Sequence, residues 1–120
     1  MELTQFEKLV VNALEDIKGK DIQVINTTRL TSLFDRVIVA TGDSNRQTRA
    51  LARNVANTVR EAGLPVISIE GEDSGEWVLV DLGDIVVHVM QPAIRSYYNL
   101  EELWGATPAR PTRPAAARIT

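Results

Sequence analysis

Apolar and polar residues alternate along residues 76–90 in a pattern that predicts a β-hairpin. Residues 77–82 and 85–90 are rich in β-branched and aliphatic side chains, and Gly83-Asp84 between them is a two-residue turn signal. A period of two then gathers one wholly aliphatic face, consisting of Val78, Val80, Leu82, Ile85, Val87 and Val89. The opposite face, here called the mixed face, consists of Trp77, Leu79, Asp81, Val86, His88 and Met90. The aliphatic face belongs in a core, whereas the mixed face must be covered by a helix or by another molecule.

Two segments repeat apolar residues at helical spacing. Thr4 and Glu7 form a capping box in front of the first apolar stripe, and Gly19 is the expected end of that helix. A second capping box begins at Ser44, and Gly63 ends the helix that follows it. The apolar face of this second helix consists of Leu51, Ala52, Val55, Ala56, Val59 and Ala62.

The other segments predict three more strands and a last helix. Residues 21–26 indicate a short strand, and residues 34–41 indicate a strand covered on both faces because its central residues are all apolar. Residues 66–70 indicate a third core strand, which is expected to run parallel to the strand at 34–41 with a right-handed crossover. Pro92 suits the start of a final short helix.

These elements follow one another in the order α-β-β-α-β-β-β-α within one domain, residues 1–105. The order predicts an α/β (α+β) fold, a mixed five-stranded sheet flanked by helices. Residues 106–120 are rich in proline, alanine and arginine and lack an apolar pattern, so a disordered tail is expected there.

Composition narrows the class of protein. A hydrophobic content of 44% and a charged content of 24% are ordinary for a globular domain, and no apolar run has the length of a membrane span. The first residues lack the basic and apolar regions of a signal peptide, and the chain contains no cysteine. We therefore expect a cytoplasmic protein without disulfides or thiolate metal sites.

The net charge of −3 is unevenly distributed. Residues 106–120 carry three arginines and no acid, whereas residues 1–105 carry ten basic residues against sixteen acidic ones, a net charge of −6. An acidic body disfavours naked nucleic acid as the direct partner, because phosphate binding requires clustered lysine and arginine. It favours a basic protein partner.

Two features resemble catalytic or ligand sites and are better explained as turns. The segment Thr41-Gly42-Asp43-Ser44 precedes a helix, yet it lacks the glycine pattern and the lysine of a P-loop, and Asp43 would repel phosphate. Asp81 and Asp84 are close in sequence but have no evident third ligand for a metal ion. A nucleotidyltransferase-like enzyme that binds metal and nucleotide is kept as the alternative function.

The aromatic residues and the histidine allow both a structural and a binding role. His88 has no neighbouring nucleophile, so a hydrogen-bonded structural or interface histidine is favoured over a general base. Tyr97, Tyr98 and Trp104 suit either packing on the sheet or a protein interface, where such residues supply anchors.

The turn and hairpin residues together resemble the ribosomal silencing factor family, also called RsfS or Iojap-like. The resemblance covers about residues 4–105 and leaves the tail outside it. Ile94 stands where the family is expected to have a polar residue. The matching positions are Asp35, Ala40-Thr41-Gly42, Ser44, Arg46, Ala52, Glu70-Gly71, Trp77, Asp81-Leu82-Gly83-Asp84, Val87-His88-Val89-Met90, Arg95, Tyr98, Leu100-Glu101 and Leu103-Trp104.

The resemblance implies a translation repressor that needs no catalytic residue, metal or cofactor. Proteins of this family bind the fourteenth ribosomal protein of the large subunit and block joining of the small subunit when nutrients are scarce, and their fold resembles nucleotidyltransferases. The resemblance also implies that Trp77, Leu82 and Tyr98 belong to the contact surface. With the mixed face, the predicted partner-binding set is Trp77, Leu79, Asp81, Leu82, His88, Met90 and Tyr98. Nearby ribosomal RNA and a second copy of the free chain are further candidate partners, whereas DNA and membranes are not expected.

Overall fold

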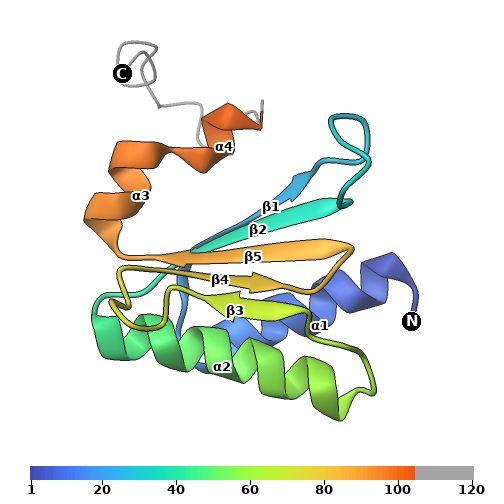
Figure 1. The fold of residues 1–120 in the computed structure, drawn as a ribbon, viewed down its shortest axis with the longest axis horizontal. Helices are drawn as coiled ribbons and strands as arrows, with labels where there is room; N and C mark the ends of the chain where they lie inside the picture. The colour runs from blue at the N-terminus through green and yellow to red at the C-terminus, as the bar shows by residue number, and fades with distance from the viewer. Residues whose placement is uncertain (105–120) are drawn as a thin grey trace.

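The computed structural model describes residues 1–104 and contains one five-stranded sheet with helices on both faces (Figure 1). Its helices are α1 (Leu3–Asp16), α2 (Asn45–Glu61), α3 (Pro92–Tyr98) and α4 (Leu100–Leu103). Its strands are β1 (Lys20–Asn26), β2 (Arg36–Thr41), β3 (Ser68–Glu70), β4 (Trp77–Asp81) and β5 (Ile85–Met90). The predicted class, a mixed five-stranded sheet flanked by helices, is confirmed. The predicted tail, residues 106–120, lies outside the described residues.

The strands lie in the order β1-β2-β5-β4-β3. The central pair β2 and β5 is parallel, and the other neighbouring pairs are antiparallel. The predicted hairpin has the expected register, since Val78 pairs with Val89 and Val80 pairs with Val87. At its turn, the Leu82 amide donates a hydrogen bond of 2.9 Å to the Ile85 carbonyl, and Gly83 takes a left-handed φ of 89°.

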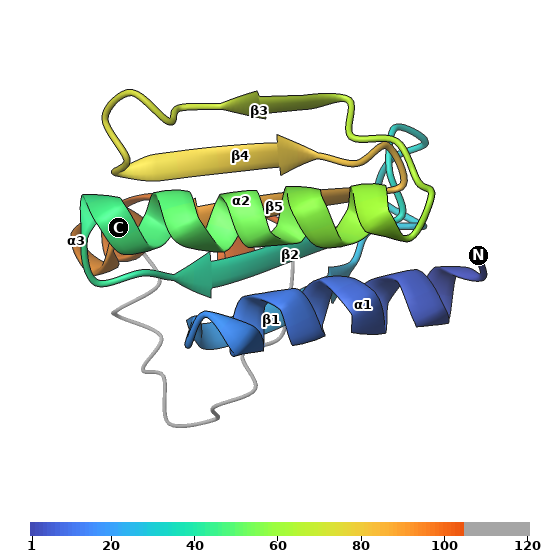
Figure 2. The ribbon, with the colours of Figure 1, turned by 90° about the horizontal axis from the view of Figure 1, so that it is seen from below.

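The main core lies between the sheet and helices α1 and α2, which cover the same face (Figure 2). The aliphatic face of the hairpin packs there, as predicted, together with Leu51, Val55 and Val59 of α2, which are fully buried. Full burial of one such aliphatic side chain stabilises the fold by about 1.5–3 kcal/mol. Ala62, predicted to extend this face of α2, is exposed because the helix ends one residue earlier.

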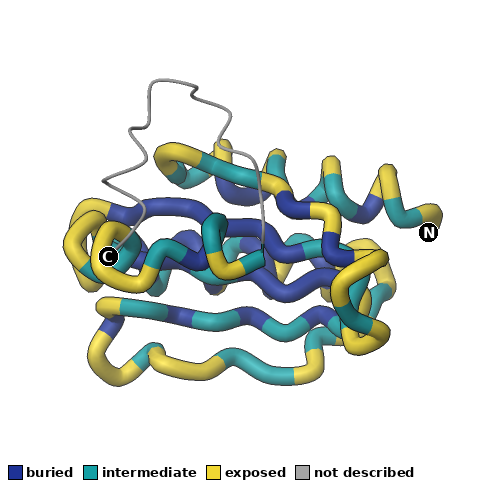
Figure 3. Tube along the Cα trace, turned by 90° about the horizontal axis from the view of Figure 1, so that it is seen from above, coloured by how far each residue is buried: buried dark blue, intermediate teal, exposed yellow. Residues whose placement is uncertain are grey.

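The structure corrects the placement of the strand predicted at residues 66–70. β3 runs in the same direction as β2, but β5 and β4 lie between them, so the two strands are not neighbours. β3 is a partly exposed edge strand rather than a core strand (Figure 3). The reason is that every residue of β5 except His88 is apolar, whereas β3 is Ser-Ile-Glu, so β5 gains more than β3 from the central position beside β2.

The ends of α1 also differ from the sequence prediction. The helix begins at Leu3, and its N-cap residue Glu2 makes no side-chain cap, so Thr4 is inside the helix. At the other end Lys18, not Gly19, takes the left-handed conformation, with φ of 62°. Gly19 is required for close packing instead, because a Cβ there would lie 3.0 Å from the Leu14 carbonyl oxygen. The Gly19 amide donates to that oxygen at 2.9 Å.

The predicted capping box of α2 is confirmed at its first residue. The Ser44 hydroxyl accepts a hydrogen bond of 3.1 Å from the Gln47 amide. The Gln47 side chain reaches back one residue further than expected, to the amide of Asp43 at 2.7 Å. At the other end Gly63 follows the helix, as predicted, and it takes a left-handed φ of 82°.

The last predicted helix is divided in two. Asn99 takes a left-handed φ of 47° between α3 and α4, and Pro92 occupies the start of α3 as predicted. Within residues 1–104, none of the helices combines the length and apolar character that a membrane crossing requires.

Candidate functional site

The mixed face of the hairpin lies on the side of the sheet opposite α1 and α2, and α3 and α4 cover one end of it (Figure 1). Leu100 of α4 packs there on Met90, and Ile94 and Trp104 lie at the border of the same cluster. The other members of this small core come from the neighbouring strands, Ile25, Val37 and Val39. A helix therefore covers the mixed face near Met90, and the end near Asp81 has no helix over it.

Two of the seven predicted binding residues lie in the interior. Met90 has no exposed surface, because it lies under the α3–α4 segment. Leu82 is 4% exposed and belongs to the main core, because the hairpin register turns it toward α1 and α2. Both side chains therefore pack inside the domain, and the binding role predicted for the seven residues stays a prediction. Trp77, Leu79, Asp81, His88 and Tyr98 remain at or near the surface.

His88 and Trp77 are joined across the hairpin. The Trp77 indole Nε1–H donates a hydrogen bond of 3.0 Å to His88 Nδ1, so the neutral imidazole carries its proton on Nε2. Burial disfavours the charged ring and lowers the pKa of His88 from 6.5 to about 4. His88 is thus a neutral acceptor at physiological pH that fixes the orientation of the tryptophan.

A row of aromatic side chains extends from Trp77 onto α3. The Trp77 and Tyr98 rings lie 4.9 Å apart, and Tyr97 meets Tyr98 edge-on at 5.0 Å. Tyr98 is 51% exposed and Tyr97 is 80% exposed, which is unusual for residues of this size. This aromatic row presents apolar area and hydroxyl groups to solvent, the combination found at the centres of protein interfaces.

A buried ion pair that the sequence did not indicate holds α3 and α4 against the sheet. Arg95 donates from Nε and Nη2 to Glu101 Oε2 at 3.2 and 2.7 Å, and from Nη1 to Thr41 Oγ1 at 2.8 Å. The two side chains are only 10% and 18% exposed. Their six-residue separation brings them together only because Asn99 breaks the helix, so helical spacing gave no signal. The pair fixes the helix that carries Tyr97 and Tyr98.

The acidic loop between β3 and β4 is attached to α2. Arg49 donates to the carbonyl oxygens of Glu72 and Asp73 at 2.6 and 2.8 Å, and Arg53 forms an ion pair of 2.9 Å with the Glu72 carboxylate. The negative charge of this loop is therefore partly neutralised within the chain. Asp81 places a carboxylate at the open end of the mixed face, where it accepts a hydrogen bond of 2.9 Å from the Gly83 amide.

The turn before α2 has the structure of a strand-to-helix connection. Lys20 pairs with Asp43, and Gly42 fits tightly against Thr48, whose Cγ2 would lie 2.9 Å from an added Cβ. Among the described residues, no three or more histidine, cysteine, aspartate or glutamate side chains are grouped so as to hold a metal ion.

Comparison with known proteins gives a consistent result. The family model described as "ribosomal silencing factor during starvation" matches residues 2–119. The ribosomal silencing factor RsfS of Chromobacterium violaceum is 61% identical over 105 residues, which cover 88% of this chain and 86% of the relative. A crystal structure of a protein from the same organism superposes with a TM-score of 0.88 at 57% identity and covers 97% of both chains. A mouse protein named for mitochondrial assembly of the ribosomal large subunit is 30% identical over 80% of this chain, which spans 43% of that protein.

Proposed function

From the premise that this chain belongs to the ribosomal silencing factor family, we propose that it binds the large ribosomal subunit and prevents the small subunit from joining it. The expected contact is the fourteenth ribosomal protein of the large subunit, and the expected setting is nutrient limitation in the cytoplasm. The proposed mechanism is steric occlusion, so that no covalent bond is made or broken.

The observation that carries this proposal is the aromatic row beside the uncovered end of the mixed face. Tyr97 and Tyr98 expose large aromatic surface, Trp77 is locked in place by His88, and Asp81 adds a carboxylate nearby. Rigid aromatic anchors lose little conformational entropy on binding, so a small surface of this kind is able to provide high affinity.

Charge supports the choice of partner. Residues 1–105 carry a net charge of −6, which complements a basic ribosomal protein better than the phosphates of ribosomal RNA. The name of the mouse relative connects a protein of similar sequence with the large subunit in particular.

The proposal is tested by co-sedimentation of the purified protein with isolated large and small subunits. We expect the protein to pellet with large subunits only, and to reduce the yield of joined ribosomes when small subunits are added. Binding to neither subunit, with subunits that still join each other, would refute the proposal.

The variant that tests the surface is Tyr98→Ala, because Tyr98 is half-exposed and its removal leaves the core intact. We expect at least tenfold weaker binding to large subunits, since truncation of an aromatic anchor costs about 2 kcal/mol or more. Leu30→Ala removes a similarly exposed side chain from a loop outside the aromatic row and serves as the control. Equal binding by both variants would remove the aromatic row from the interface.

A further inference from the structure

The open end of the mixed face forms a groove of about 470 Å³. Its floor contains Leu79 and Val86, and the loop before β2 contributes Leu33 and Phe34 to one wall. Ile67, just before β3, lies on the other wall. Leu33 is 79% exposed and Ile67 is 62% exposed, so two large aliphatic side chains face solvent where they have an apolar floor beside them.

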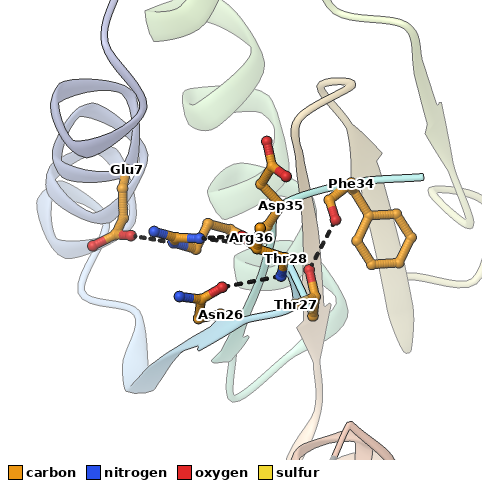
Figure 4. Close-up of polar contacts among 7 residues, drawn as sticks. All are labelled: Glu7, Asn26, Thr27, Thr28, Phe34, Asp35 and Arg36. Atoms are coloured by element: carbon orange, nitrogen blue, oxygen red, sulfur yellow. Dashed lines mark hydrogen bonds and ion pairs between the residues drawn. The ribbon is translucent and has the colours of Figure 1, made fainter. Parts of the chain in front are cut away.

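The first wall is rigidly supported. Thr27 bonds to the other end of its loop twice. Its amide donates to the Asp35 carbonyl at 3.0 Å, and its Oγ1 donates to the Phe34 carbonyl at 3.0 Å (Figure 4). Arg36 then ties the base of the loop to Glu7 of α1 at 2.9 Å (Figure 4). The amides of Asp35 and Arg36 both donate to the Asp84 carbonyl, at 2.8 and 3.1 Å. The loop is thus fixed to the hairpin turn, and the groove exists before anything binds.

The second wall is attached to the same hairpin. The Ile67 amide donates a hydrogen bond of 2.8 Å to the Asp81 carbonyl, and β3 pairs with β4 through Ser68 and Asp81. Gly83 leaves room beside Ile67, whose Cδ1 would lie 3.5 Å from a Cβ at that position. A preformed groove of this kind binds with a smaller loss of conformational entropy than a mobile surface.

The charge of the groove has one sign. Glu70 and Asp81 lie among its lining residues, and none of the lining residues is basic. The apolar floor and walls suit a large aliphatic or aromatic side chain, and the two carboxylates suit an adjacent ammonium or guanidinium group. RNA does not fit this chemistry, because its phosphates would be repelled.

We propose that this groove is a second anchoring point for the ribosomal partner, and that it receives a large apolar side chain of a ribosomal protein that lies next to a lysine or arginine. The inference rests on the proposed function, and it extends the contact surface beyond the aromatic row to β3 and to Leu33 and Phe34 of the loop before β2. Leu79 and Asp81 of the groove lie on the same face of β4 as Trp77 of the aromatic row, so this strand connects the two anchoring points.

The test measures the affinity of purified large subunits for full-length Leu33→Ser and Glu70→Lys variants. We expect about tenfold weaker binding for each, because one loses an apolar contact and the other repels the basic group. Leu30→Ser, in the same loop but outside the groove, and Glu61→Lys, exposed at the end of α2, are matched controls with wild-type affinity expected. Thermal unfolding of all four variants verifies that each is folded.

The outcomes separate the two proposals. If wild-type protein does not bind large subunits, both the proposed function and this inference are refuted. If wild-type protein and the controls bind, and the groove variants bind equally well, the groove is not an anchoring point while the proposed function stands.

A crosslinking experiment identifies the occupant. A photoreactive benzoylphenylalanine is placed at position 33, or at the exposed control position 103 of α4, and the protein is irradiated on purified large subunits. We expect position 33 to crosslink to a ribosomal protein, at an apolar residue within two positions of a lysine or arginine. Crosslinks instead to ribosomal RNA or to a second copy of the chain would overturn the proposal. So would crosslinks to the chain's own Arg118-Ile119, which also places an apolar residue next to a basic one.

Discussion

His88 is a partly buried side chain that orients a neighbouring residue of the proposed binding surface. It accepts the indole N–H of Trp77 at 3.0 Å, and its strand neighbours are the apolar Leu79 on one side and Val39 on the other. The hydrogen bond satisfies a donor that would otherwise have to find solvent, and it holds the tryptophan against Tyr98. The role of His88 is therefore to position Trp77.

Burial of this histidine makes stability depend on pH. The pKa of His88 is about 4 in the folded protein and 6.5 in the unfolded chain, so the unfolded chain binds more protons between these values. Stability is fully present above pH 6.5 and falls as the pH decreases toward 4. We expect urea unfolding to show a loss of about 1–2 kcal/mol between pH 7.5 and pH 5 from this residue.

The matched variant for this measurement is His88→Asn, which keeps an acceptor for the indole and does not titrate. Carboxylates also titrate in this range, so the informative quantity is the difference between wild type and variant. If the two proteins lose the same free energy of unfolding between pH 7.5 and 5, His88 does not contribute as described.

The sequence predicted which residues of the hairpin share a face with His88 but not the extent to which that face is covered. Period-two alternation and a two-residue turn fix which residues of β4 and β5 face the same side, and the observed pairs agree. The same pattern cannot reveal that Met90 is fully buried, because the residues that cover it come from α4. The hairpin register predicted Leu82 on the aliphatic face, whereas the family resemblance implied that it belongs to the contact surface. The structure places it in the core.

At the scale of elements, the α3–α4 segment depends on a break in the helix. Asn99 turns the chain so that Glu101 returns to Arg95, and the charged pair is enclosed between the segment and Thr41 of β2. A helix continuing through Asn99 would separate these residues. The aromatic row therefore owes its position to a helix interruption combined with a buried charge pair.

The buried pair predicts an asymmetric response to mutation. Glu101→Leu leaves the Arg95 guanidinium buried without its carboxylate and should lower the free energy of unfolding by about 2 kcal/mol or more. The double variant Arg95→Met with Glu101→Leu removes both charges and should be less destabilised than the single variant. Chemical denaturation of both variants is the measurement. A double variant that is less stable than Glu101→Leu alone would contradict this account.

The elements most clearly predicted by the sequence are those with strong periodicity. The burial of the apolar face of α2 and of β2 could be predicted from the sequence alone, because few arrangements of the chain cover so many aliphatic side chains. The order of the strands within the sheet was harder to predict from the sequence. Residues 66–70 alternate like many core strands, and only competition with the more apolar β5 assigns them to the edge.

At the scale of the whole molecule, net negative charge lies in residues 1–105, here called the acidic body, and net positive charge lies in the residues that follow it. Residues 1–105 carry a net charge of −6 and residues 106–120 carry +3. The proposed surface belongs to the acidic part, with Glu70 and Asp81 at the groove. Attraction between exposed charges is screened by salt, so the charge of the body is expected to affect how readily a basic partner is captured.

Binding to large subunits should accordingly weaken several-fold as monovalent salt is raised from about 0.1 to 0.5 M. A full-length variant with Arg110, Arg113 and Arg118 replaced by glutamine should retain this salt dependence, because the acidic body supplies the attraction. Titrations of both proteins at several salt concentrations provide the comparison. Loss of the dependence in the variant would assign it to arginine contacts with RNA.

The parallel pairing of β2 with β5 also limits when a newly synthesised chain is able to fold. β2 leaves the ribosome long before its central partner, since Arg36 pairs with Ile85 and Thr41 pairs with Met90. Until β5 emerges, the aliphatic β2 has only β1 beside it and one unpaired edge. Contacts between distant parts of the chain form slowly, so the sheet closes only after residues 85–90 have left the ribosome. A factor proposed to silence ribosomes thus acquires its binding surface only after the ribosome that makes it has released β5.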